Sequence, residues 1–224
     1  MPVDSTASIT LSAYNKVPDF ARGQVRDLRV RWALEEIGRP YRTELMDAFA
    51  ERPAGYRQRQ PFGQVPALRD GSIDIFESGA ILIYIGEQDE RLLPREPAAK
   101  WKAMSWTMSA FSSIEPPIMR LINLDLFNAD KDWARLARVP ALEFIEQRLT
   151  GLANALGSKD WLADRFTIAD IAMITVLRNL ERTEVLDGFE LLTDYIARGT
   201  ARPAFKAALA QQLADFDETI SVKA

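Results

Sequence analysis

The 224-residue sequence contains no cysteine and no histidine. Without cysteine the chain has no disulfide, no thiolate nucleophile and no thiolate metal site. Without histidine it lacks the usual general base and the commonest transition-metal ligand. A glycine-rich phosphate loop is missing too. These absences exclude large classes of catalysis, and we expect no metal and no nucleotide cofactor.

A strong charge excess and a long apolar run are also missing. The 28 Lys and Arg and 32 Asp and Glu residues give a formal net charge of −4. The chain therefore lacks the excess of positive charge that is typical of nucleic-acid-binding proteins. No apolar run approaches the roughly 20 residues of a membrane span, and residues 1–8 do not resemble a signal peptide. With 47% hydrophobic residues, we expect a globular cytoplasmic protein that binds neither nucleic acid nor membrane.

The first 90 residues mix strand-like and helix-like runs. Periodicity predicts four strands, over 8–14, 41–45, 65–68 and 72–76, and two helices, over 25–37 and 78–86. The first two strands are joined through a helix and should be parallel. Asp70-Gly71 suits a tight hairpin turn, so the last two strands should be antiparallel. Residues 46–60 are polar and predict only a short or irregular helix.

Beyond the proline-punctuated segment 93–97 nothing resembles a strand. This segment is the best domain boundary, and it divides the chain into a mixed α/β domain over 1–92 and an all-helical domain over 98–224. The predicted helices of the second domain are one over 100–128, bent or broken at Pro116-Pro117, one after Pro140 that ends at Gly157, one opened by Thr167, and two over 190–198 and 203–216.

The helix that begins after Thr167 has the clearest start signal. In Thr167-Ile168-Ala169-Asp170 the threonine hydroxyl and the aspartate carboxylate can satisfy free backbone amides, and Phe166 with Ile171 supplies a hydrophobic staple. These roles explain Thr167 and Asp170 fully, so we interpret both as structural.

Two motifs resemble a known family. Gln60-Pro61-Phe62-Gly63-Gln64-Val65-Pro66-Ala67-Leu68, followed by Phe76-Glu77-Ser78-Gly79-Ala80-Ile81, resembles the N-terminal domain of the cytosolic glutathione transferase superfamily. In the second domain, the capping box at Thr167 and Arg202-Pro203-Ala204-Phe205 resemble that family's helices. The resemblance implies a thioredoxin-like domain joined to a helical bundle, a homodimer built across both domain types, and a cytoplasmic role in detoxification.

The resemblance also implies a glutathione site. The family proline at the position of Pro66 is cis, so that Val65 would offer its backbone N–H and C=O to the cysteinyl part of glutathione like an added strand. Ser78 at a helix N-terminus would bind the γ-glutamyl carboxylate, Glu77 would accept from the α-ammonium, and Gln64 would lie near the same group. Ser78 as a plain helix cap, Glu77 as a first-turn charge and Pro66 as a turn residue are the structural alternatives.

The residue that would stabilise the glutathione thiolate departs from the family pattern. The family usually places a tyrosine, serine or cysteine near the end of the first strand or the start of the first helix, but those positions here fall on Ala13 or near Gln24. Residues 16–21 resemble an insertion. We favour Asn15 as the amide donor, with Arg22 next as a charge.

Further alternatives for the thiolate remain open. Tyr14 could act through its hydroxyl, or it could be a core aromatic. The backbone amides of Gly23-Gln24 could act at a helix N-terminus. Asn15 as a turn residue and Arg22 as a solvated charge are equally consistent with the sequence.

Three functions compete. The leading hypothesis is a dimeric glutathione transferase that conjugates the glutathione thiolate to a hydrophobic electrophile, bound between the domains. The helix containing Trp101, Met104, Met108 and Phe111 would line part of that electrophile site, although aromatic residues and methionines at helical spacing belong more often to a core. The second is a glutathione-binding or ligand-carrying protein of the same fold without catalysis. The third is a glutathione-dependent disulfide reductase or peroxidase that uses no protein cysteine.

Overall fold

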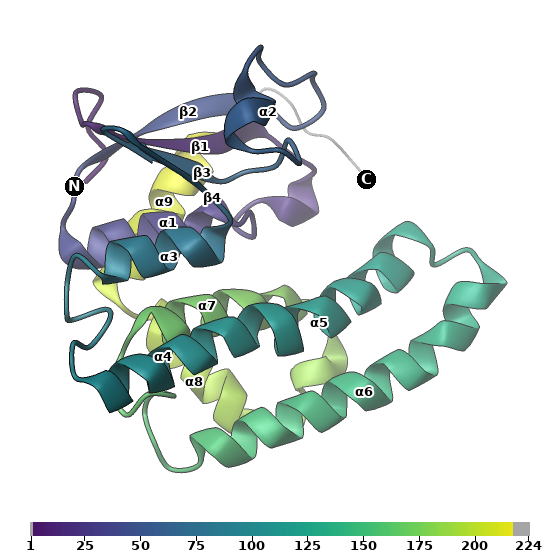
Figure 1. The fold of residues 1–224 in the computed structure, drawn as a ribbon. Helices are drawn as coiled ribbons and strands as arrows, with labels where there is room; N and C mark the ends of the chain where they lie inside the picture. Colours follow the sequence, from purple (N-terminus) through teal and green to yellow (C-terminus); the bar gives the residue numbers. More distant parts are fainter. Residues whose placement is uncertain (1, 217–224) are drawn as a thin grey trace. The chain divides into compact units, whose positions relative to one another are not determined.

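The computed structural model describes residues 2–216, which form two compact units (Figure 1). One unit contains residues 2–93 together with 200–216, and the other is Pro94–Gly199. The predicted domains 1–92 and 98–224 differ from these units in the last segment, which belongs with the first unit. Met1 and residues 217–224 of the predicted domains lie outside the described residues.

The first unit contains a four-stranded sheet in the order β2-β1-β3-β4. The strands are β1 (Ile9–Lys16), β2 (Tyr41–Asp47), β3 (Ala67–Asp70) and β4 (Ile73–Phe76). β1 pairs in parallel with β2, and β3 is antiparallel to both β1 and β4. The predicted parallel pair and the predicted hairpin at Asp70-Gly71 are therefore confirmed.

Helices α1 (Asp27–Ile37) and α3 (Ser78–Gly86) lie side by side on one face of the sheet (Figure 1). α1 ends at Gly38, whose φ of 68° is the left-handed conformation that favours glycine. α2 (Tyr56–Arg59) is the short helix expected in the polar segment 46–60. A 3₁₀ turn, η1 (Asp19–Ala21), follows β1, so α1 begins two residues later than predicted.

Helix α9 (Pro203–Ala214) packs on α1 and explains why the C-terminal segment belongs to the first unit. The rings of Trp32 and Phe205 meet edge to face with centroids 4.9 Å apart. Arg202 holds Glu36 through two hydrogen bonds, of 2.6 and 2.7 Å. These contacts join residues far apart in the sequence, so a boundary drawn from the proline-rich segment alone could not include them.

The second unit is helical throughout its regular elements. Its helices are α4 (Pro97–Ser109), α5 (Glu115–Ile122), α6 (Asp132–Leu156), α7 (Ile168–Leu177) and α8 (Glu190–Thr200), with π-helical segments η2 (Ala110–Ile114) and η3 (Asn123–Phe127) and 3₁₀ turns η4 (Arg178–Leu180) and η5 (Glu184–Leu186). The interruption expected at Pro116-Pro117 lies just before them, in η2. Both prolines fall in the first turn of α5, where a missing N–H costs no hydrogen bond.

Helix α6 corrects the prediction that a helix starts after Pro140. It begins at Asp132 and carries Pro140 in its interior. A proline there removes one backbone hydrogen bond and crowds the preceding turn. Burial of Ala134 before the proline and of Ile145 and Leu149 after it stabilises the continuous helix.

The predicted capping box opens α7. Thr167 Oγ1 accepts from the Ala169 amide at 3.2 Å, and Asp170 Oδ2 accepts from the Thr167 amide at 2.8 Å. Tyr195 Oη also donates to Asp170 Oδ1 at 2.7 Å. Thr167 and Asp170 are fully occupied by these bonds, which fits the structural role expected of them.

Candidate functional site

The strand register brings three predicted segments to one end of the sheet. Ala67 is paired with Phe76 at the end of the β3–β4 hairpin, so Val65-Pro66 and Glu77-Ser78 flank the same end. β1 reaches this end as well, because Ser12 Oγ accepts from the Ala67 amide at 2.7 Å. The residues that follow in β1 are Ala13, Tyr14 and Asn15.

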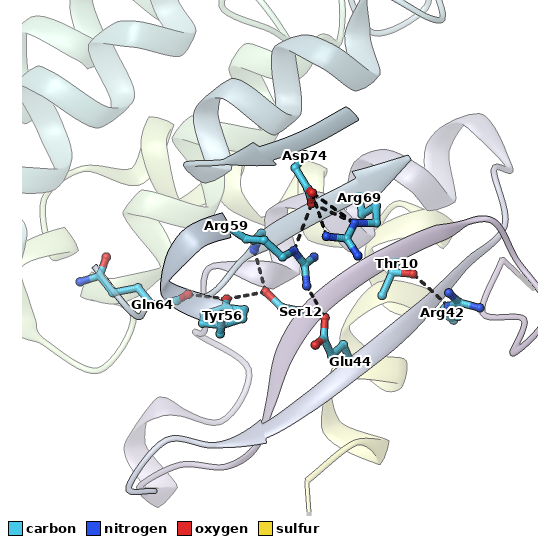
Figure 2. A network of polar contacts seen from close by, with 10 residues as sticks. Thr10, Ser12, Arg42, Glu44, Tyr56, Arg59, Gln64, Arg69 and Asp74 are labelled. Atoms are coloured by element: carbon cyan, nitrogen blue, oxygen red, sulfur yellow. Dashed lines mark hydrogen bonds and ion pairs between the residues drawn. The ribbon is translucent and has the colours of Figure 1, made fainter. Parts of the chain in front are cut away.

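A buried chain of hydrogen bonds fixes the loop that contains Gln64, Val65 and Pro66 (Figure 2). The Tyr56 hydroxyl donates to the Gln64 carbonyl at 2.6 Å, so its only proton is used there. The 2.8 Å contact between Ser12 Oγ and Tyr56 Oη therefore has Ser12 as the donor. The Ser12 hydroxyl is wholly buried and joins the two ends of the loop, from Ala67 to Gln64.

Val65 is anchored by its side chain and leaves its backbone unpaired. The side chain is buried in a small cluster with Met46, Tyr56 and Ala67. Among residues 2–216, neither the Val65 amide nor its carbonyl has a hydrogen-bond partner. The Val65-Pro66 peptide bond is cis, as the family resemblance implied. This backbone can accept an extended peptide as an added strand.

Ser78 and Glu77 lie at the N-terminus of α3. Ser78 is 4% exposed, and its hydroxyl accepts a hydrogen bond of 3.1 Å from Arg29 Nη1 of α1. Glu77 is exposed and has a φ of 71°, a left-handed value that is strained in a residue other than glycine. A helix N-terminus backed by a buried guanidinium is a favourable place for a carboxylate.

Arg29 and the Ser12–Tyr56 pair are site residues that sequence reasoning missed. Arg29 is one of several charged residues between the apolar positions of α1, yet it is only 3% exposed. Ser12 and Tyr56 carry no motif. No motif marks Arg29 either, because its burial follows from the packing of α1 against α3 and α9.

Gln64 fits the predicted site in part. Its backbone is held at both ends, because its carbonyl accepts from Tyr56 and its amide donates to Gln60 Oε1 at 3.0 Å. Its side chain is exposed. The amide group is thus free to contact a ligand at this end of the sheet.

Asn15 and Tyr14 lie at the carboxyl end of β1. Asn15 is half-buried, and its Oδ1 atom is buried without a hydrogen-bond partner. The Tyr14 ring packs against the Val65 cluster, and its hydroxyl accepts from Arg52 Nη2 at 3.1 Å. The Tyr14 side chain is therefore near the segment that holds Val65.

Arg22 and the amide of Gln24 already have interaction partners within the described residues. Arg22 forms an ion pair with Asp19 at 3.5 Å, and its guanidinium lies 5.7 Å from the centroid of the Phe216 ring. The Gln24 amide donates to the Ala21 carbonyl at 2.9 Å, so it closes a turn before α1 begins. The backbone alternative at Gly23-Gln24 is weakened by this bond.

The predicted electrophile-site residues lie on α4, except Phe111, which lies in η2. Trp101 and Met108 are 66% and 51% exposed, whereas Met104 and Phe111 are half-buried. No group of three or more acidic residues within residues 2–216 is arranged to hold a metal ion. In the same residues, no helix is long and apolar enough to cross a membrane.

Comparisons with known proteins identify the family of this chain. The family model for the glutathione S-transferase N-terminal domain matches residues 20–87. A glutathione S-transferase of Hyoscyamus muticus is 30% identical over 169 residues, which cover 66% of this chain and 75% of the relative.

Solved structures match over most of the chain. A glutathione transferase family member from Pseudomonas fluorescens Pf-5, with two glutathione bound, has a TM-score of 0.82 and 26% identity, covering 92% of this chain and 94% of its own. A glutathione transferase from Burkholderia graminis, with two glutathione molecules bound per subunit, has a TM-score of 0.77 and 26% identity, covering 90% and 87%. By sequence and by fold, the chain belongs to the cytosolic glutathione S-transferase superfamily, with a thioredoxin-like first unit and a helical second one.

Proposed function

We propose that this protein is a cytoplasmic glutathione transferase that conjugates the glutathione thiolate to a hydrophobic electrophile in detoxification. One observation carries the proposal. The unpaired Val65 backbone lies at the same end of the sheet as the N-terminus of α3, where Arg29 supports the Ser78 hydroxyl. An extended peptide with a carboxylate at one end is complementary to this arrangement, and glutathione is such a peptide.

Each part of glutathione has a partner in this proposal. The cysteinyl amide and carbonyl pair with the Val65 backbone. The γ-glutamyl carboxylate accepts from Ser78 and from the free amides of α3. Glu77 accepts from the α-ammonium, and the exposed Gln64 amide contacts the same γ-glutamyl group. Pro66 and the Ser12–Tyr56 bonds hold the loop in place.

The chemical step begins with the thiolate. Its sulfur attacks an electrophilic carbon, a C–S bond forms, and the leaving group departs with the electron pair, the thiol proton having passed to solvent. Lowering the thiol pKa by about two units requires roughly 2.7 kcal/mol of preferential stabilisation of the anion. Asn15 is the proposed donor, and Tyr14 is the next candidate because both lie at the end of β1. Arg22 ranks below them because of its ion pair with Asp19.

Exposed apolar residues supply surface for the proposed electrophile site and for a proposed contact between subunits. Trp101 and Met108 on α4 supply apolar surface for the electrophile. Phe62 and Phe76 are 66% and 37% exposed and their rings lie 6.4 Å apart, a composition that suits a contact between subunits. We therefore propose a homodimer, to be checked by sedimentation of the parent and of Phe62→Ala.

A second candidate is a glutathione-dependent disulfide reductase. It is favoured by the two glutathione molecules in the Pseudomonas and Burkholderia proteins. One glutathione thiolate would attack the substrate disulfide and release a thiolate, and the second would attack the mixed disulfide and release the other. Two glutathione molecules are oxidised to the disulfide and the substrate is reduced to two thiols, so no protein cysteine is needed.

Calorimetric titration with glutathione, combined with thiolate absorbance across pH, tests the proposal. Binding that weakens in Ser78→Ala, together with a thiol pKa below that of free glutathione, supports a transferase. Binding without a lowered thiol pKa favours a carrier. Turnover of a disulfide but not of aryl halides favours the reductase, and no binding at millimolar glutathione overturns all three.

A further inference from the structure

Arg59, the last residue of α2, forms ion pairs with both outer strands of the sheet. Its Nη1 atom donates to Glu44 Oε2 on β2 at 2.7 Å, and its Nε atom donates to Asp74 Oδ1 on β4 at 3.0 Å. β2 and β4 are the two ends of the strand order β2-β1-β3-β4. One guanidinium therefore reaches across the sheet, as Figure 2 shows, and its side chain is only 14% exposed.

Helix α2 depends on contacts of this kind because it is only four residues long. A single helical turn is not stable on its own. Its N-cap is Gly55, which has no side chain to cap the helix, and of the four side chains that the structure describes in α2 only Tyr56 is buried. The burial of Tyr56 at one end and the ion pairs of Arg59 at the other therefore hold the helix on the sheet.

Arg59 also contacts the residue that fixes the loop containing Val65. Its guanidinium carbon lies 5.9 Å from the centroid of the Tyr56 ring, a distance at which the ring face attracts a cation. The Tyr56 hydroxyl donates to the Gln64 carbonyl at 2.6 Å, one residue before Val65. The contacts thus run from the outer strands through Arg59 and Tyr56 to the loop.

The charges around Arg59 are balanced. Arg69 on β3 donates to Asp74 Oδ2 at 2.8 Å, so two arginines and two carboxylates share this face of the sheet. The planar fork of an arginine can direct separate N–H groups to two carboxylates, whereas lysine has one compact charge on a flexible stem. Lysine at position 59 should therefore keep the charge but hold the two strands less well.

We propose that Arg59 is a positioning residue for glutathione. By holding α2 on both outer strands it fixes Tyr56, and through Tyr56 it presents the Val65 backbone to the cysteinyl part of the peptide. This inference rests on the proposed function, and it gives Arg59 no contact with glutathione itself. Loss of Arg59 should weaken binding because the loop must then be ordered when glutathione binds. Turnover at saturating glutathione should be kept, since the loop is ordered in the complex.

The test separates binding from turnover, with an aryl halide as the electrophile. Arg59→Met should raise KM for glutathione about tenfold and change kcat less than about twofold. Arg59→Lys should raise KM about threefold. Calorimetry should give the same losses of affinity without reliance on turnover. Arg69→Met is the matched control, because it removes an arginine from the same Asp74 at a residue of β3, and it should keep the parent's KM and affinity.

A double-mutant cycle tests whether Arg59 acts through its carboxylate partners. Glu44→Gln should lower the affinity for glutathione about threefold in the parent. In the Arg59→Met background the same change should have no further effect, because the ion pair is already broken. Losses that simply multiply would show that Glu44 acts independently of Arg59, and the proposed hold across the sheet would be wrong.

Two further results would overturn the role of Arg59 alone. One is the parent's affinity in Arg59→Met protein that circular dichroism shows to be folded. The other is a lowered kcat with an unchanged KM, which would place Arg59 in the chemical step. Should Arg59→Met not fold, Arg59→Lys decides, and the parent's KM in that variant would reject the proposal. A parent protein that binds no glutathione would instead overturn the proposed function, and this role of Arg59 with it.

Discussion

Arg29 Nη1 donates a hydrogen bond of 3.1 Å to Ser78 Oγ and joins the first turn of α1 to the first residue of α3. Both side chains are almost completely buried, at 3% and 4% exposure. A serine that only capped a helix would use its hydroxyl on its own backbone amides. Here the hydroxyl accepts from Arg29, which leaves its proton for a ligand and places a positive charge behind it.

Substitution of Ser78 and of Arg29 should weaken the same interaction. Ser78→Ala is expected to lower the affinity for glutathione about tenfold, the loss of a hydrogen bond to a charged group. Arg29→Met should lower it by a similar factor, because the buried charge no longer favours the carboxylate. Calorimetry on both single variants and on the double variant measures the coupling, and the two losses should not add.

The control for this pair is Ser72→Ala, on the exposed turn between β3 and β4. It should bind glutathione like the parent. Circular dichroism of each variant separates weakened binding from unfolding. Folded Ser78→Ala protein with parent affinity would remove Ser78 from the site.

The thiolate donor can be assigned from the thiol pKa in the complex. Asn15→Ala should raise the pKa of bound glutathione by about one unit, which corresponds to 1.36 kcal/mol. Asn15→Asp should raise it further, because a carboxylate repels the thiolate. Thiolate absorbance against pH measures both. Arg22→Ala is the comparison, and a larger shift there than in Asn15→Ala would reverse their order.

The fold was predictable from local patterns wherever one short segment decided the outcome. Asp70-Gly71 has the turn chemistry of a hairpin, and Thr167 with Asp170 has the chemistry of a helix start, so both were found. The start of α6 was missed because Pro140 is normally a boundary, and the burial that outweighs its cost is not a local property. The placement of α9 against α1 was missed for the same reason.

The site was predictable only where it carries a motif. Val65, Pro66, Glu77 and Ser78 occur in recognisable strings, so their positions followed from the resemblance. The burial of Arg29 follows from the packing of α1 against α3, which is not a local property of the sequence. The Ser12–Tyr56 bond spans 44 residues, and pairings of that kind follow from tertiary packing rather than from spacing.

The loop that holds Val65 should depend on the Tyr56 hydroxyl. Tyr56→Phe leaves the Gln64 carbonyl without its donor, and we expect the free energy of unfolding to fall by about 1–2 kcal/mol. The affinity for glutathione should fall with it, since the Val65 backbone loses its support. Urea unfolding and calorimetry measure the two effects. Tyr84→Phe on α3, which removes a bond to Asp70 at the end of β3, is the control and should leave glutathione binding intact.

Asp74 predicts the direction of one pH effect on stability. Hydrogen bonds from Arg69 and then Arg59 hold the pKa of its carboxyl below the ordinary 3.8 (Figure 2). The unfolded chain therefore binds more protons between the two pKa values, and stability rises with pH in that window. The contribution is present above pH 3.8 and is lost as the pH falls through the lower value.

Removal of the Asp74 carboxylate should flatten this dependence. Below pH 3.8, the melting temperature of Asp74→Asn should change less with pH than that of the parent. The carboxylate should contribute under about 1 kcal/mol to the free energy of unfolding, because the pair is partly exposed. Calorimetric melting from acid to neutral pH measures it. Asp194→Asn on the exposed side of α8 should keep the parent's slope. Equal slopes for Asp74→Asn and the parent would remove Asp74 as the cause.

Stability of the sheet unit should depend on α9, although α9 is more than a hundred residues away in the sequence. Phe205 is 3% exposed and its ring meets Trp32, so Phe205→Ala should lower the free energy of unfolding by about 3–5 kcal/mol. Because α9 packs on α1, hydrogen exchange in α1 should accelerate, while exchange in α6 stays close to the parent's. Lys206→Ala, on the exposed side of α9, is the matched control. Acceleration in α6 without any in α1 would assign α9 to the helical unit instead, as the proline-rich boundary suggested.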